Sequence, residues 1–416
     1  MATGDHDVIE GNQVANDAIS NKACMDEENL TVRIPTNVIV EHILPALSDR
    51  STFNALRLTH KELYSASHHV LPPWPTSPQP CQTRVGTKQQ VSCIAVHPNR
   101  WTVACSGTTS DSILYLWNRR LGPQPPIQSG AALCWCLAFS PDGRYLVAGS
   151  QDQSIKVWEL IPNYKGQDPY HRFHAVLSKT LVGHLSPVFA VAFSPDSMWL
   201  ASGSYNKIVK LWRVDDGTCL QSFYGNAGVV RNISFSPSGQ QMAVASNDYM
   251  TRIWNLNKDS FKDSTGLPLE GGESGYWASV ALSPCGRYCV SSNSSRTTIL
   301  MWDLLPANKS KENTKGVHST CATAPKFTPA DAPSPEVIRT FSGHSGSITS
   351  LCFTPDGATL VSSSADKTVR LWNVSDGTCW KVLRGHESLI SSVAVDGCTL
   401  ITGSWDCTIR FWDIRP

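Results

Sequence analysis

Seven tryptophans at nearly regular spacing constrain the fold of this 416-residue chain more than any other feature. Successive members of the series are 41, 54, 42, 48, 70 and 40 residues apart, so the underlying period is about 40 residues. Such a period is typical of proteins built from repeated units that are each too small to bury their own apolar face. The seven are Trp117, Trp158, Trp212, Trp254, Trp302, Trp372 and Trp412.

Two further columns of residues keep register with the tryptophans. A serine or threonine stands eight residues before each one, and an aspartate stands six residues before five of the seven. The hydroxyl residues are Thr109, Ser150, Ser204, Ser246, Ser294, Ser364 and Ser404. The aspartates are Asp111, Asp152, Asp248, Asp366 and Asp406, with Asn206 and Arg296 in the other two units. Three columns in register indicate seven copies of one structural unit.

The sixth unit indicates what each copy should form. Residues 348–353 and 359–362 have the composition of β-strands, and 369–372 alternates apolar residues with a charge, as a strand with one buried face does. Asp376-Gly377 predicts a hairpin turn, because glycine adopts positive φ without strain. Residues 380–383 follow as a fourth strand. The unit is therefore predicted to be a four-stranded blade of a propeller.

Short motifs agree with this interpretation. Gly-His pairs stand at Gly183-His184, Gly343-His344 and Gly385-His386, and Trp-Asp pairs at Trp302-Asp303 and Trp412-Asp413. With these motifs, residues 81–416 resemble the WD-repeat (Trp-Asp) β-propeller family. The resemblance implies an all-β fold, a ring of seven four-stranded blades. Longer steps are explained by a loop extension at 161–179 and a predicted disordered insertion at about 305–335.

The same resemblance implies a hydrogen-bonded tetrad of His, Ser or Thr, Asp and Trp inside a blade. Two units keep all four members: His344, Ser364, Asp366 and Trp372, and His386, Ser404, Asp406 and Trp412. A Ser, His and Asp grouping could also indicate a hydrolase. Here it recurs at blade spacing without the Gly-x-Ser-x-Gly elbow of such enzymes. We therefore expect structural tetrads, no catalytic residues and no enzyme activity.

The chain ends three residues after Asp413, so the seventh unit lacks an outer strand of its own. Residues 81–86 precede the first inner strand, 91–96, and can supply the missing strand. Pairing of residues 81–86 with the seventh unit would close the ring and remove its exposed edges.

Composition narrows the classes of partner. The chain has 35 basic and 34 acidic side chains, which gives no electrostatic reason to expect nucleic-acid or membrane binding. Its 14 cysteines fall mostly within strands and lack the paired spacing of a zinc site, so neither a metal nor another cofactor is expected. No apolar run reaches membrane-spanning length and no signal peptide opens the chain. We expect an intracellular protein, cytoplasmic, nuclear or both.

The first 80 residues have a different composition. Residues 1–30 are acidic and predicted to be disordered, 31–70 to be helical, and 71–80 to form a Pro-rich linker. Residues 34–65 resemble an F-box, which implies docking on the Skp adaptor of a cullin-RING ubiquitin ligase. The adaptor-binding residues would be Ile34, Pro35, Val38, Ile43, Leu44, Leu47 and Leu56. Pro45 lies inside the first helix, and Lys61-Glu62-Leu63-Tyr64 replaces the usual basic-Trp ending. A helical cap on the propeller is the alternative.

One face of the propeller is the candidate partner-binding site. Aligned on the inner strands, five positions near the central channel carry aromatic or arginine side chains, the types enriched at binding hot spots. They are Trp135, Phe189, Tyr205, Arg231 and Trp405. For Trp135 and Phe189, packing between neighbouring blades is the alternative.

The sequence thus predicts a non-catalytic scaffold that binds a protein or peptide target on this face. The leading hypothesis is a substrate-recognition subunit of an F-box ubiquitin ligase, with an adaptor and a cullin as partners. The alternative is a WD-repeat scaffold of a chromatin, RNA-processing or trafficking complex without ligase coupling.

Overall fold

A computed structural model describes residues 82–85, 89–108, 113–119, 122–130, 132–162, 173–248, 250–256, 266–269, 278–293, 297–304 and 335–415. All of them belong to the unit Pro80–Pro416. The expected N-terminal segments at 1–30, 31–70 and 71–80 lie outside the described residues, as do 305–334. The adaptor-binding residues proposed from sequence, from Ile34 to Leu56, therefore lie outside them as well.

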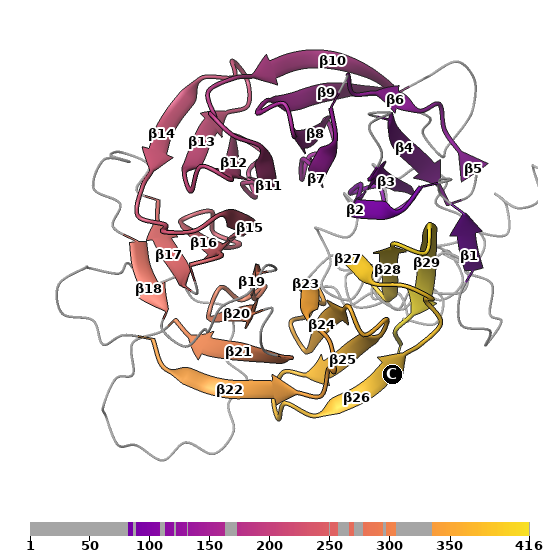
Figure 1. Cartoon of the computed structure of the whole chain (residues 1–416), viewed down its shortest axis with the longest axis vertical. Coiled ribbons are helices and arrows are strands. Elements are labelled where there is room, and N and C mark those ends of the chain that lie inside the picture. Colours follow the sequence, from indigo (N-terminus) through magenta and orange to yellow (C-terminus); the bar gives the residue numbers. More distant parts are fainter. Residues whose placement is uncertain are drawn as a thin grey trace, which may run out of the picture. The chain divides into compact units, whose positions relative to one another are not determined.

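The described residues form seven antiparallel sheets, here called blades 1 to 7 (Figure 1). Blade 1 contains β2 (Val91–Val96), β3 (Thr102–Gly107), β4 (Ile113–Asn118), β5 (Gly122–Pro123) and β6 (Ile127–Gln128). Blade 2 contains β7 (Cys134–Phe139), β8 (Tyr145–Ser150), β9 (Ile155–Pro162) and β10 (Phe173–Leu181). Blade 3 contains β11 (Val188–Phe193), β12 (Trp199–Ser204), β13 (Val209–Arg213) and β14 (Cys219–Phe223). Blade 4 contains β15 (Val230–Phe235), β16 (Gln241–Ser246), β17 (Thr251–Asn255) and β18 (Gly266–Leu269).

Blades 5 to 7 complete the set. Blade 5 contains β19 (Ala278–Leu282), β20 (Tyr288–Asn293), β21 (Thr298–Asp303) and β22 (Val337–Ser342). Blade 6 contains β23 (Ile348–Phe353), β24 (Thr359–Ser364), β25 (Val369–Asn373) and β26 (Cys379–Leu383). Blade 7 contains β27 (Ile390–Asp396), β28 (Thr399–Ser404), β29 (Thr408–Asp413) and β1 (Gln82–Val85). The expected all-β propeller of seven blades is confirmed.

The first strand of each blade lies nearest the centre, and these inner strands contact one another in succession around the ring (Figure 1). Strand β27 of blade 7 contacts β2 of blade 1, so the ring is closed. Strand β1 pairs antiparallel with β29, with Gln82 opposite Phe411 and Val85 opposite Thr408. The prediction that residues just before the first inner strand supply the last outer strand is confirmed. At the same seam, Arg100 Nε lies 3.2 Å from Asp396 Oδ1.

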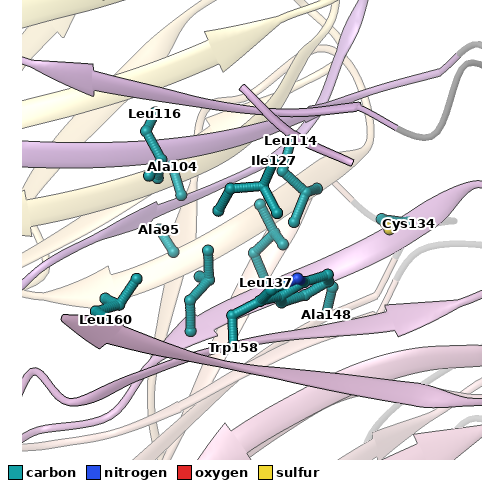
Figure 2. Close-up of a cluster of buried hydrophobic side chains, with 11 residues drawn as sticks. Ala95, Ala104, Leu114, Leu116, Ile127, Cys134, Leu137, Ala148, Trp158 and Leu160 are labelled. Carbon is teal, nitrogen blue, oxygen red and sulfur yellow. The ribbon is translucent and has the colours of Figure 1, made fainter. Parts of the chain in front are cut away.

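The apolar core lies between neighbouring blades. Figure 2 shows one cluster, in which Trp158, Leu137 and Leu160 of blade 2 gather with Leu114 and Leu116 of blade 1. All five side chains are almost fully buried. Each large apolar side chain buried in this way stabilises the fold by roughly 1.5–3 kcal/mol. In blades 2 to 7 the tryptophan of the third strand packs in such a cluster between blades, which explains why it recurs.

Two local features differ from a uniform blade. Strand β10 pairs with β9 from Phe173 opposite Pro162 onward, so much of the predicted loop extension at 161–179 is instead a longer hairpin. In blade 1 the outer strand is broken into β5 and β6, each of two residues. Pro123, Pro125 and Pro126 fall there, and proline has no N–H to donate to a ladder.

Candidate functional site

In blade 6 a buried histidine is linked by hydrogen bonds to three other side chains, as in the predicted tetrad. His344 Nδ1 lies 2.8 Å from Asp366 Oδ2, and His344 Nε2 lies 2.8 Å from the hydroxyl of Ser362. Trp372 Nε1 donates to the same hydroxyl at 2.8 Å. The sequence prediction gave this role to Ser364 and requires correction. The Ser364 hydroxyl instead donates to the backbone carbonyl of Gly346 at 2.9 Å.

Strand geometry explains the correction. Ser362 lies opposite Arg370 in the register of β24 and β25, so Trp372 is its diagonal neighbour on the same face. Ser364, at the end of β24, accepts from the backbone N–H of Asp366 at 3.0 Å and so shapes the turn into β25.

Blade 7 repeats the arrangement. His386 bonds Asp406 at 2.7 Å through Nδ1 and Thr402 at 2.7 Å through Nε2, and Trp412 donates to Thr402 at 2.9 Å. Thr402 therefore takes the place that the sequence prediction gave to Ser404, whose hydroxyl donates to the carbonyl of Leu389 at 2.8 Å.

The aspartates of these tetrads are held as charged acceptors. Burial would raise the pKa of the Asp366 carboxyl, but hydrogen bonds from His344 and Thr368 outweigh it and hold the pKa below its usual range. The Asp406 carboxyl is held the same way, by His386 and Thr408. The side chains of His344 and His386 have no solvent-accessible surface. A histidine sealed from solvent cannot reach a substrate, so both groups stabilise their blades.

Blade 3 keeps the histidine but lacks the acid. His184 Nε2 lies 2.7 Å from the Ser202 hydroxyl, to which Trp212 donates at 2.8 Å. Asn206 stands where the other two blades have an aspartate. Burial, together with the nearby charge of Lys210, lowers the pKa of His184 to about 4. His184 is therefore a neutral histidine at pH 7.

The side chains of the inner strands, which lie nearest the centre, differ from one side of the ring to the other. At the second residue of the inner strand, blades 1, 6 and 7 carry hydroxyls that bond the backbone of the next blade. Ser92 donates to the carbonyl of Cys134 at 3.4 Å, Thr349 to that of Ile390 at 2.5 Å, and Ser391 to that of Val91 at 2.6 Å. These side chains fasten neighbouring blades together.

In blades 2 to 4 the same position carries Trp135, Phe189 and Arg231, and Phe189 contacts both of the others. The rings of Trp135 and Phe189 are 5.2 Å apart between centroids, and the guanidinium carbon of Arg231 lies 4.5 Å from the Phe189 centroid. Tyr205, at the turn between β12 and β13, lies 6.3 Å from Phe189. The structure thus brings together four of the five residues selected from sequence. We call these four residues the mouth cluster.

The four side chains of the mouth cluster differ in their exposure to solvent. Trp135, Phe189 and Arg231 are half-buried, and Tyr205 is 56% exposed. Trp135 Nε1 donates to Gln151 Oε1 at 2.6 Å, which fixes its indole ring. The side chains therefore pack across blade boundaries and still present surface at the channel mouth. Trp405 lies apart from the cluster, in the turn between β28 and β29 of blade 7, and is half-buried.

Sequence reasoning missed three exposed apolar side chains in loops at the Tyr205 end of blade 3. Val182 and Leu185 are 75% and 80% exposed in the loop before β11, and Tyr224 is 68% exposed after β14. These loops lie at the same end of blade 3 as Tyr205, whose N–H donates to the Pro187 carbonyl at 2.9 Å. The signal was present in the sequence, because Leu185 follows a Gly-His pair where the sixth and seventh units have serine and glutamate.

The part of the chain that the structure describes holds neither a candidate metal site nor a candidate membrane-spanning helix. No group of three or more His, Cys, Asp or Glu side chains there could hold a metal ion. No helix in the same residues is long and apolar enough to cross a membrane.

Comparison with known families identifies the repeats. Five segments match the family described as WD domain, G-beta repeat: residues 126–159, 175–213, 217–255, 335–373 and 377–413. Together with the seven sheets, these matches show that the chain carries WD repeats and folds into a seven-bladed β-propeller.

Similar curated proteins come from several organisms. Nuclear distribution protein PAC1 of Arthroderma benhamiae is 28% identical over 317 residues, covering 73% of this chain and 63% of that protein. Protein HIR1 of Cryptococcus neoformans is 26% identical over 241 residues, covering 52% of this chain and 27% of that protein. The transcriptional corepressor LEUNIG_HOMOLOG of Arabidopsis thaliana is 24% identical over 258 residues, covering 61% and 26%. The chain spans less than two thirds of the length of each of these relatives.

Proposed function

We propose that this chain is a non-catalytic scaffold that binds a segment of a partner protein at the mouth cluster of Trp135, Phe189, Tyr205 and Arg231. One observation carries the proposal: the aromatic side chains of the mouth cluster remain partly exposed, and the same end of blade 3 carries the exposed Leu185, Val182 and Tyr224. Exposed apolar and aromatic side chains gathered on one face are typical of interaction sites. Trp405, on blade 7, would contact a longer partner separately.

The names of the relatives favour an assembly role without ligase coupling. PAC1 is named as a nuclear distribution protein, and LEUNIG_HOMOLOG as a transcriptional corepressor. Neither name is that of a ubiquitin-ligase subunit. We therefore propose an intracellular scaffold of a trafficking or chromatin type, ahead of the F-box hypothesis that the residues between Ile34 and Leu56 suggested.

The test is affinity capture with the full chain. Wild type and a Phe189→Ala/Tyr205→Ala variant are compared as baits in an extract of the native cell. The matched control is Trp380→Ala, which removes an exposed aromatic residue from outer strand β26. Proteins captured by wild type and the control but lost with the double variant support the proposal. Equal capture by all three baits would contradict it.

The same capture separates the two functional hypotheses. Skp-type adaptor and cullin peptides that disappear with Ile43→Ala/Leu47→Ala would restore the ligase hypothesis. A captured assembly that survives this change, and that contains no adaptor, supports the scaffold without ligase coupling.

A further inference from the structure

We propose that Arg231 anchors an acidic side chain, so that the partner segment bound at the mouth cluster carries an aspartate or glutamate beside an apolar residue. The inference rests on the proposed function of the same site and adds the chemical class of its partner. Four properties of the site carry it: unpaired charge, absence of a structural bond, fixed orientation and apolar surroundings.

Arg231 lacks the carboxylate partner that neighbouring cations have. In β17 of the same blade, Arg252 lies 2.7 Å from Asp248. In blade 2, Lys156 lies 3.3 Å from Asp152. Among the described residues, no carboxylate pairs with Arg231, and its buried Nε has no hydrogen-bond partner. Burial lowers the pKa of its guanidinium. A half-buried cation without a counter-charge is costly, and an incoming carboxylate would offset that cost.

Arg231 also lacks the structural bond made by its equivalents on the far side of the ring. At this strand position Thr349 and Ser391 donate to the backbone of the next blade. Arg231 makes no such bond within the part of the chain that the structure describes. A long cationic side chain thus occupies a position where a small hydroxyl fastens the other blades, which indicates a role outside the ring.

Stacking on Phe189 holds the guanidinium in place. The guanidinium carbon is 4.5 Å from the centroid of that ring, within the range of a cation–π contact. A guanidinium held by one face keeps its N–H edge available for two parallel hydrogen bonds to a carboxylate. Less rotamer entropy is then lost on binding than for a free arginine.

The surroundings of Arg231 select an apolar neighbour for the acidic residue. Phe189 connects Arg231 to Tyr205, and the Tyr205 backbone is bonded to the loop that carries Leu185. A segment whose carboxylate reaches Arg231 would therefore lay its adjacent side chain against Tyr205 and Leu185.

The test selects peptides from a phage-displayed library of random decapeptides on the immobilised full chain. Wild type, Arg231→Gln and a control, Arg213→Gln, are screened in parallel. Arg213 is an exposed arginine at the end of β13 in the neighbouring blade 3, paired with Asp216 at 3.3 Å. We expect Asp and Glu to be enriched in peptides selected by wild type and the control, and the enrichment to disappear with Arg231→Gln.

The most enriched peptide is then synthesised with its acidic residue intact and as the Asn or Gln form. Wild type should bind the neutral form about 10- to 100-fold more weakly, the usual effect of one charge-assisted hydrogen-bonded contact. Arg231→Gln should bind both forms with equal affinity. The comparison of two peptides on wild type alone remains decisive if Arg231→Gln fails to fold.

Failures of the two proposals are distinguishable. Enriched peptides that compete at Tyr205 but show no acidic preference would overturn the inference and leave the proposed function standing. Equal affinity of the acidic and neutral peptides for wild type would do the same. A screen without any enriched peptide would overturn both.

Discussion

In blades 6 and 7, Thr349 and Ser391 donate hydrogen bonds to the next blade, whereas at the same strand position in blades 3 and 4 stand Phe189 and Arg231, which stack on each other. The backbone register is the same on both sides of the ring. Blades 6 and 7 also hold complete His–Asp tetrads, and blade 3 has Asn206 in place of the acid. One side of the propeller is thus rich in polar contacts that stabilise it, and the other carries the aromatic and arginine side chains for which we propose a partner.

The largest expected effect is the loss of a tetrad acid. Asp406→Ala removes the partner of buried His386 and of the Glu387 N–H, and should lower the free energy of unfolding by about 3 kcal/mol. The matched change in blade 3, Asn206→Ala, should cost well under half of that, because no charged acceptor is lost. Denaturant titrations measure both. Equal losses would remove the distinction between the two sides.

Acid should reveal the second effect, at His184. Its folded pKa of about 4 lies below the ordinary value of 6.5, so the unfolded chain binds more protons between those values. Stability should therefore fall as pH drops from 6.5 to 4, by about 2 kcal/mol after allowance for incomplete burial. His184→Asn should unfold with a flatter pH dependence across this window. An unchanged slope would show that His184 does not titrate there.

The tetrad aspartates should respond at lower pH. Because the folded pKa of Asp366 is depressed, its stabilising contribution is complete above its unfolded pKa of about 4 and is lost as pH falls below that value. In acid titration, Asp366→Asn should therefore lose less stability than wild type as the pH falls below that value.

A smaller effect is expected at the hydroxyls that fasten the blades. Ser391→Ala removes the bond to the Val91 carbonyl at the closing seam and should cost about 1 kcal/mol. Chemical denaturation of this variant beside wild type measures it. An unchanged free energy of unfolding would mean that this hydrogen bond stabilises the fold no more than the hydrogen bond to water that it replaces.

The smallest effect on stability should come from the binding side. Leu185→Ser gives blade 3 the serine that blade 6 has at Ser345, and because Leu185 is 80% exposed its unfolding free energy should stay within about 0.5 kcal/mol of wild type. Partner capture should nevertheless weaken. A destabilised variant would show that Leu185 belongs to the core.

The repeat pattern predicted the blades, their number and the closing strand, because the tryptophans of blades 2 to 7 pack between blades and so recur. The repeat pattern did not identify Ser362 and Thr402 as the tetrad hydroxyls. Aligned repeats show which residue types recur at a position, and not which atoms face each other. Strand β10 was mistaken for loop because apolar Val176 and Leu177 occupy exposed positions and Lys179 a half-buried one, which hides in the sequence the alternation that marks a half-buried strand. The exposed Leu185 was missed because an apolar residue is ordinarily assigned to the core.

The pairing of β1 with β29 has a consequence for how the molecule unfolds. Ser391 and Val91, bonded at the same seam, are 300 positions apart in the chain. Loop-closure entropy grows only with the logarithm of length, so joining the two ends costs little more than joining a much shorter segment. Open repeat arrays can melt from their terminal units inward. A ring has no terminal unit, so its seven blades should melt as one cooperative transition, and breaking the seam should convert that transition into gradual fraying from blades 1 and 7.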